Sequence, residues 1–95
     1  MATPTKISVD QFCVYYQVET TFVYSLSDHG LIELMRSDQG DMIDFEQLAD
    51  IEKYIHLHYE LEINMEGLEA ITHLLNRVQQ LQQELRRLRN DHGQQ

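Results

Sequence analysis

Residues 8–30, SVDQFCVYYQVETTFVYSLSDHG, contain the signals of two helices joined by a short turn. Ser8 is a typical N-cap, because its hydroxyl can accept a hydrogen bond from the first turn of a helix. A second apolar stripe at helical spacing consists of Phe22, Val23 and Leu26. Gly30 suits the left-handed position that ends a helix. We therefore predict helices over about 8–15 and 20–29, which together have the layout of a helix-turn-helix.

The chain after Gly30 predicts a small β-hairpin. Two short apolar runs, 31–35 and 42–43, flank a polar turn that contains Gly40. Short apolar runs on either side of a glycine-bearing turn are typical of a hairpin. We therefore expect the helix-turn-helix to carry a short β-hairpin wing.

A third helix is predicted from the N-cap Asp44 to residue 63. Within it, residues 55–63 alternate strictly between apolar and polar types, which taken alone would indicate a strand. However, no Gly or Pro interrupts residues 45–63, and a lone central strand would need pairing partners that this short chain can hardly supply. We therefore favour a helix over the whole stretch.

The last third of the chain repeats its apolar residues in heptads. The a and d positions hold Ile71, Leu74, Val78, Leu81, Leu85 and Leu88. We predict one helix from Met65 to about Asn90 that pairs with a second copy through this stripe. The alternative is a helix that folds back on its own domain. β-Branched residues at a with Leu at d favour a parallel pair, whereas the charges accept either orientation.

These elements predict a mainly α fold, a winged helix-turn-helix with a long C-terminal dimerisation helix. We divide the chain into a core (1–64), the dimerisation helix (65–90) and a flexible tail (91–95). Gly67 lies in the first turn of the last helix, where Gly lowers helix stability relative to Ala. A close approach of the third and fourth helices would explain it.

The negative charge belongs to the core. The chain has 16 acidic and 7 basic residues, a formal net charge of −9, and all of that excess lies within residues 1–64. Affinity for DNA depends on several Lys or Arg contacts to phosphates. No Lys or Arg lies between Lys6 and Arg36, so we do not expect the helix-turn-helix to hold nucleic acid.

The sequence indicates no enzyme, metal site or cofactor. With Cys13 as its single cysteine, the chain has neither a disulfide framework nor a thiolate zinc site. Two pairs at i, i+4 spacing supply only two metal ligands each: His56 with Glu60, and His58 with Glu62. The spacing reveals no nucleophile with its base, and the glycines form no phosphate-binding loop.

Nothing in the sequence predicts a membrane protein. No apolar run approaches the roughly 18–20 residues of a membrane span. The N-terminal string MATPTKIS lacks the apolar centre of a signal peptide. We therefore expect a cytoplasmic module without a membrane partner.

Three strings of the chain resemble the CbpM-type chaperone modulators. They are Phe12-Cys13-x-Tyr15-Tyr16, Leu26-x-x-x-Gly30-Leu31-Ile32 and Leu57-His58-x-x-Leu61-x-Ile63-Asn64-x-Glu66-Gly67. The resemblance covers about residues 7–90. This family has a domain similar to that of the MerR transcriptional regulators. The resemblance therefore implies a winged helix-turn-helix followed by a long helix that pairs antiparallel in a homodimer.

The resemblance also implies a partner. CbpM-type proteins bind the J-domain of a DnaJ-type co-chaperone and inhibit its action with Hsp70, and J-domains dock on Hsp70 through a basic helix. An acidic module suits such a helix, because complementary charges speed encounter while apolar anchors supply much of the affinity. The alternative function is that of a MerR-like DNA-binding transcriptional regulator.

We expect the partner-binding residues on the predicted third helix. The candidate charges are Glu46, Asp50, Glu52, Glu60 and Glu62, and the candidate anchors are Tyr54 and Tyr59. The competing interpretation is that these carboxylates form an ordinary solvated face and the tyrosines close the small core. Tyr15 and Tyr16 suit a core or a contact role, because Tyr combines an apolar body with a polar tip.

Overall fold

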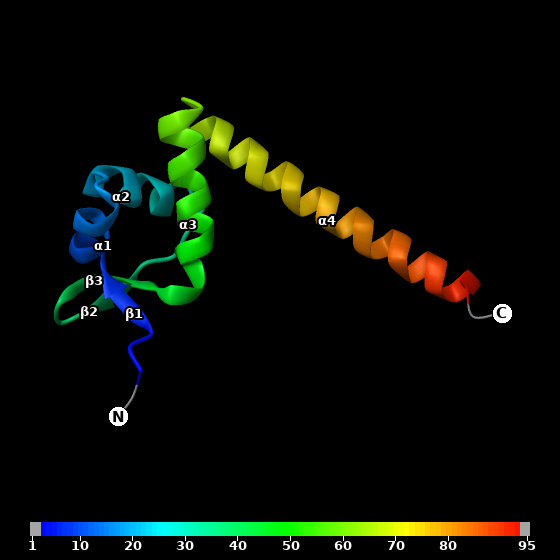
Figure 1. Ribbon diagram of the computed structural model, residues 1–95, viewed down its shortest axis with the longest axis horizontal. Coiled ribbons are helices and arrows are strands. Elements are labelled where there is room, and N and C mark those ends of the chain that lie inside the picture. Colours follow the sequence, from blue (N-terminus) through cyan, green and yellow to red (C-terminus); the bar gives the residue numbers. More distant parts are fainter. Residues whose placement is uncertain (1–2, 94–95) are drawn as a thin grey trace.

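The computed structural model describes residues 3–93, with side chains for residues 3–90. Figure 1 shows a small body formed by the first part of the chain and a last helix that projects from it as an arm. The molecule measures 56 × 41 × 20 Å along its principal axes. The architecture is mainly helical with a small antiparallel sheet, and this confirms the predicted fold class.

The helices and strands follow one another closely along the chain. In order they are β1 (Lys6–Ser8), α1 (Val9–Tyr16), α2 (Thr20–Asp28), β2 (Met35–Ser37), β3 (Gly40–Asp44), η1 (Phe45–Gln47), α3 (Leu48–Ile55), η2 (His56–Glu60) and α4 (Met65–Gly93). Of the two short turns, η1 is a 3₁₀ turn and η2 is a π-helical turn.

α1 and α2 form the predicted helix-turn-helix. The Ser8 hydroxyl accepts a hydrogen bond from the backbone N–H of Gln11 at 3.1 Å, which confirms the predicted N-cap. Gln17 ends α1 in the left-handed conformation with a φ of 58°, and Gly30 follows α2 with a φ of 74°. Both helices begin and end within one residue of the predicted positions.

The wing belongs to a three-stranded antiparallel sheet in which β3 lies between β1 and β2. β2 and β3 are the predicted hairpin, with Met35 opposite Met42. β1 was not predicted; it pairs Ile7 with the fully buried Ile43 of β3. The hairpin also begins later than predicted. Residues 31–34 form a loop, because Ile32 turns into the core.

The predicted third helix consists of η1, α3 and η2, which run without a break to Glu60. Asp44 caps it as predicted, because its carboxylate accepts a hydrogen bond from the backbone N–H of Glu46 at 2.9 Å. The alternating residues 55–60 are therefore helical. A π-helical turn inserts an extra residue into the helical repeat, so η2 shifts the side-chain positions that follow α3.

The third helix ends three residues earlier than predicted. Glu62 adopts a left-handed conformation with a φ of 57°, which ends the helical path. The backbone N–H of Ile63 then donates to the carbonyl of Leu57 at 3.1 Å. The Asn64 side chain begins α4 by accepting a hydrogen bond from the Gly67 N–H at 2.8 Å. Residues 61–64 are thus a tight connection between η2 and α4.

One apolar core joins all parts of the body. Its buried residues are Val9, Phe12, Cys13, Phe22, Val23, Leu26, Ile32, Ile43, Ile51, Tyr54 and Leu68. Leu68 comes from α4 and is fully buried, so the first turns of the arm belong to the same core. His29 at the end of α2 also pairs with Glu69 of α4. These contacts fix the direction in which the arm leaves the body.

Gly67 is a site of close approach, although not between the helices that the sequence suggested. A Cβ atom added there would lie 2.6 Å from Cγ2 of Ile63, in the connection that precedes α4. Such a distance requires something to move. The absence of a side chain at residue 67 therefore lets the connection turn tightly into α4.

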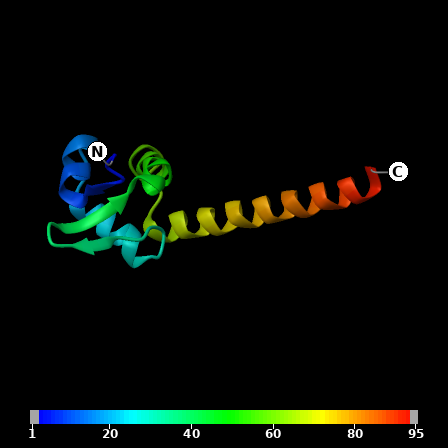
Figure 2. The same cartoon turned by 90° about the horizontal axis from the view of Figure 1, so that it is seen from below.

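Beyond its first turns α4 leaves the body, as Figure 2 shows from a second direction. The helix extends to Gly93, three residues farther than the predicted end at about Asn90. The rest of the predicted flexible tail, residues 94–95, lies outside the described residues. Within the described part of the chain, no helix is both long enough and apolar enough to cross a membrane.

Candidate functional site

In a helix-turn-helix the second helix reads DNA, and the groove between this helix, α2, and the wing is acidic here. Asp10 and Asp41 both line this hollow of about 270 Å³. The Tyr24 hydroxyl donates to Oδ2 of Asp41 at 2.8 Å, and this hydrogen bond is the main cause of a raised pKa of Tyr24. Nε of Arg36 lies 3.9 Å from the other carboxylate oxygen of Asp41.

This arrangement is unfavourable for phosphate. Arg36 is the cation that lines the hollow, and its side chain is 96% exposed and directed at a carboxylate of the protein itself. Two carboxylates with one arginine leave a net negative field, whereas phosphate binding needs an excess of cations. The lack of Lys and Arg noted in the sequence is thus located at this groove.

The outer side of α1 carries an exposed apolar pair. The side chains of Val14 and Tyr15 are 80% and 73% exposed, while Phe12 and Cys13 of the same helix are buried. The rings of Tyr15 and Tyr16 meet edge to face, with ring centres 5.1 Å apart. A shallow, largely apolar hollow of about 330 Å³ lies between this pair and the first turn of α1.

The five predicted charges are all exposed, but they do not form one face. Asp50 points into a cleft toward α4, whereas Glu52 lies on the side of Tyr16 and, after burial, is the main cause of that tyrosine's raised pKa. Glu60 pairs with His56 of the same turn, with Nδ1 and Oε2 2.8 Å apart. The two other predicted charges, which lie in η1 and in the connection before α4, are Glu46 and Glu62.

The two predicted anchors differ from each other. Tyr54 is only 6% exposed and its hydroxyl reaches the carbonyl of Leu31 at 3.5 Å, so it closes the core and does not suit an anchor for a partner. The physical reason is that Tyr54 belongs to the buried core of the body, which also includes Leu68 from the first turn of α4. Tyr59 is 47% exposed and packs beside Phe22 at 5.2 Å, so part of its ring remains accessible.

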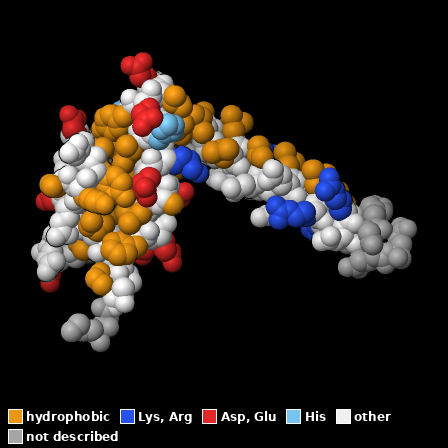
Figure 3. All heavy atoms as spheres, in the orientation of Figure 1, with side chains coloured by type: hydrophobic (Ala, Val, Ile, Leu, Met, Phe, Trp, Pro, Cys, Tyr) orange, Lys and Arg blue, Asp and Glu red, His pale blue; other side chains and the backbone are white. Residues whose placement is uncertain are grey.

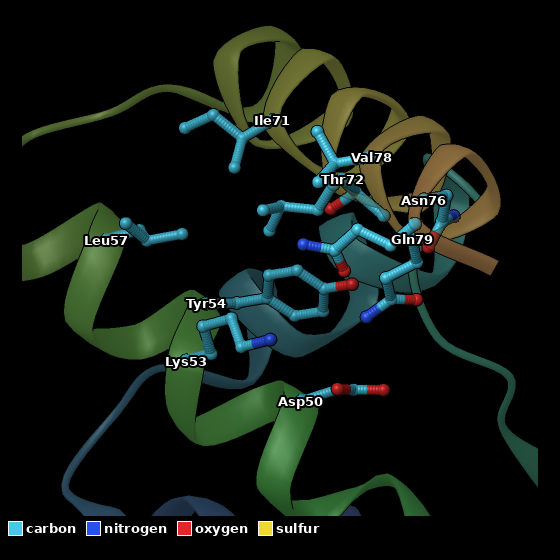
Figure 4. A pocket seen from close by; sticks show the side chains of 11 residues that line it. Asp50, Lys53, Tyr54, Leu57, Ile71, Thr72, Asn76, Val78 and Gln79 are labelled. Carbon is cyan, nitrogen blue, oxygen red and sulfur yellow. The ribbon is translucent and has the colours of Figure 1, made fainter. Parts of the chain in front are cut away.

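A cleft of about 470 Å³ separates α3 from α4 (Figure 4). Tyr54 points across it from α3, and Ile71 and Val78 point toward it from α4. Asp50 and Lys53 form its polar rim on the α3 side. The cleft mixes apolar and polar side chains and is open to solvent.

The predicted dimerisation residues form a continuous stripe along α4 (Figure 3). Ile71 is half-buried near the body, and the residues that follow it are exposed: Leu74, Val78, Leu81, Leu85 and Leu88. Leu75 lies on the same side, is also exposed, and was not predicted because it occupies an e position. On the face seen in Figure 3, acidic side chains gather over the body and basic ones along the arm.

The two His–Glu pairs do not form a joint metal site. His58 stacks on Phe22 with ring centres 4.9 Å apart, and its Nδ1 lies 2.8 Å from the carbonyl oxygen of Ile63. It therefore fastens η2 to the body and does not face Glu62. Among the residues whose positions are described, no three His, Cys, Asp or Glu side chains are grouped to hold a metal ion. Burial raises the pKa of the Cys13 thiol, which keeps it in the unreactive form.

Two comparisons with known proteins found a match. The model of the family described as MerR HTH family regulatory protein matches residues 7–90. The chain is also similar to the chaperone modulatory protein CbpM of Pseudomonas entomophila (strain L48), with 28% identity over 80 residues, which cover 83% of this chain and 79% of that protein. No solved structure matches the chain.

Proposed function

The chain belongs to the MerR HTH family of regulatory proteins, in which it is of the CbpM type, and we propose that it is a non-catalytic chaperone modulator. Its partner is the J-domain of a DnaJ-type co-chaperone, whose action with Hsp70 it inhibits. The name of the similar Pseudomonas protein supports the role in chaperone modulation. The J-domain is the expected partner because of the family resemblance of the sequence.

The observation that carries this proposal is the acidic groove of the helix-turn-helix. The fold of a DNA reader is retained, yet Asp10 and Asp41 occupy the groove, and Arg36 is already paired with Asp41. A basic protein helix carries the charge that this surface attracts. Complementary charges raise the rate of encounter and exclude partners of the wrong sign. Occupying the basic helix of a J-domain would keep it from Hsp70.

The protein is further proposed to act as a homodimer through the stripe on α4. Large apolar side chains in a heptad pattern are stabilised when a second helix covers them. Residues 65–95 carry four acidic and four basic residues, so two copies of α4 do not repel each other. The antiparallel arrangement of MerR-like dimers would place the two bodies at opposite ends of the paired helices.

Inhibition of J-domain-stimulated ATP hydrolysis tests the function. The measurement compares the ATPase rate of Hsp70 with its DnaJ-type co-chaperone in the presence of increasing amounts of this protein. We expect a saturable fall of the rate toward the unstimulated level, because the J-domain is sequestered. The basal rate of Hsp70 alone serves as the control and should not change. A stimulated rate that is unaffected by an excess of this protein would contradict the proposal.

A DNA-binding transcriptional regulator is the second candidate, because the family match itself is to a helix-turn-helix regulatory protein. Its test is a gel shift with duplex DNA at low salt, where phosphate contacts are strongest. The acidic groove leads us to expect no retardation. Retardation that persists as salt rises toward physiological levels would favour this candidate over the chaperone modulator.

A further inference from the structure

Val14 and Tyr15 on α1 are exposed in a way that the fold does not require. Of the exposed large hydrophobic side chains in the described part of the chain, these two have the highest exposed fractions, 80% and 73%. The opposite side of the same helix packs into the core with Val9, Phe12 and Cys13. Because exposed apolar pairs of this size lower solubility and add nothing to the core, such a pair often marks an interaction site.

The tyrosine of this pair is held in place by other aromatic rings. Tyr15 meets Tyr16 edge to face at 5.1 Å, and Tyr16 stacks on the buried Phe12 at 4.4 Å. α1 itself is fixed at its start by the Ser8 cap. A side chain that is already ordered loses little conformational entropy when a partner covers it. Tyr15 therefore has the properties of a pre-organised anchor.

The surroundings of the pair are negative. Asp10 lies one turn before Val14 and lines the same hollow of about 330 Å³. Glu52 of α3 lies on the side of Tyr16, the ring that supports Tyr15. The sequence places no Lys or Arg between residues 6 and 36, so neither α1 nor α2 contributes a cation. An apolar centre with a rim of one sign of charge selects a partner of the opposite sign.

We propose that Val14 and Tyr15 are the apolar anchors on which the basic helix of the partner docks, with Asp10 as a charge on the rim. This inference rests on the proposed function and names the surface that performs it. It replaces Tyr54, which is buried, as the main anchor. The body of a second copy is a poor occupant, because residues 1–64 carry the whole net charge of −9 and two bodies repel each other. The arm of a second copy is already assigned to the stripe on α4.

Calorimetric titration of the full chain with an isolated J-domain tests this surface. The variant carries Val14→Ser and Tyr15→Ser, and the matched control is Leu61→Ser, another exposed apolar side chain in the connection before α4. We expect the control to bind like the wild type and the double variant to bind at least about tenfold more weakly, as loss of a central aromatic anchor does. Asp10→Asn should weaken binding about two- to threefold at low salt and have less effect at high salt.

The outcomes separate this inference from the proposed function. A wild type that binds while the double variant binds equally well overturns the α1 surface and leaves the proposed function intact. A wild type that does not bind overturns both. A double variant that keeps its J-domain affinity but changes the sedimentation mass assigns the pair to self-association, which also overturns the inference.

A measurement on the wild type tests the same surface even if the double variant does not fold. In NMR spectra of the wild type, the backbone amides of α1 around Val14 and Tyr15 should be among the most strongly shifted on adding the J-domain. Shifts confined to α3 and η2, with α1 unchanged, would overturn the inference in favour of the helix that the sequence first suggested.

Discussion

The arm and the body of this protein expose apolar side chains in two different ways. Along α4 the exposed residues recur in heptads, and the charges around them are balanced. On α1 the exposed residues are one adjacent pair, Val14 and Tyr15, within a body that carries the entire net charge of −9. A repeated stripe with balanced charge can meet a copy of itself, whereas a short patch with one sign of charge needs a different partner. Exposed apolar area alone therefore does not identify a partner; its repeat and the charge around it do.

The largest expected effect is the loss of the contact between the arms of two copies. Leu81→Glu places a carboxylate in the middle of the stripe, where the second copy would bury it. We expect the dissociation constant of the dimer to rise at least about 100-fold, about 3 kcal/mol, and analytical ultracentrifugation to find a monomer where the wild type is a dimer.

Gln80→Glu adds the same charge beside the stripe and should leave the mass unchanged. If the comparison between arm and body is correct, the Leu81→Glu variant also keeps its affinity for the J-domain within about twofold. A Leu81→Glu variant with the mass of the wild type would show that the stripe is not the contact between copies.

A smaller effect is expected at the junction of the arm and the body. Gly67→Ala adds a Cβ atom where Cγ2 of Ile63 would be 2.6 Å away. Overpacking of this kind costs typically about 1–3 kcal/mol, against a gain of about 1 kcal/mol in helix propensity. We therefore expect a net loss of about 1 kcal/mol in the free energy of unfolding, measured with urea.

The double variant with Ile63→Ala provides the control for this prediction. Truncating Ile63 removes the atom in conflict, so in that background Gly67→Ala should be neutral or stabilising. Equal effects of Gly67→Ala in both backgrounds would show that the contact with Ile63 does not explain the glycine.

The smallest effect concerns the body, at the acidic groove. The hydrogen bond to Asp41 raises the pKa of Tyr24, because it stabilises the protonated phenol beside a carboxylate. A raised pKa in the folded state contributes stability that is present below the pKa of the unfolded chain, about 10, and is lost as pH rises through the folded value. Tyr24→Phe removes this contribution.

Melting temperatures of the wild type and Tyr24→Phe, measured from pH 8 to above pH 10, check this sign. We expect the wild type to be the more stable of the two at pH 8 and its advantage to shrink in the alkaline range. An advantage that stays constant or grows with pH would mean that Asp41 does not hold the phenol in its protonated form.

The parts of the fold that were predicted correctly depend on signals close together in the sequence. The N-caps Ser8 and Asp44 each accept a hydrogen bond from the following turn, and such caps require only neighbouring residues. β1 was missed because a strand of three residues is defined by its pairing with β3, more than thirty residues away, and not by its own composition.

The candidate site was harder to predict than the fold. Whether a tyrosine closes the core or faces solvent depends on how the helices pack, and no local pattern reveals that Tyr54 belongs to the buried core while Tyr59 stays exposed. For Val14 a local signal did exist. It lies two positions after Phe12, so on a helix the two side chains point to nearly opposite faces, and a buried Phe12 implies an exposed Val14.

The salt dependence of J-domain binding tests the central claim most directly. Calorimetric titration of the wild-type protein with an isolated J-domain, at low and at physiological salt, measures the affinity and its electrostatic part in one experiment. We predict saturable binding that weakens as salt rises, because the acidic body attracts a basic helix. No binding at either salt concentration would contradict the account.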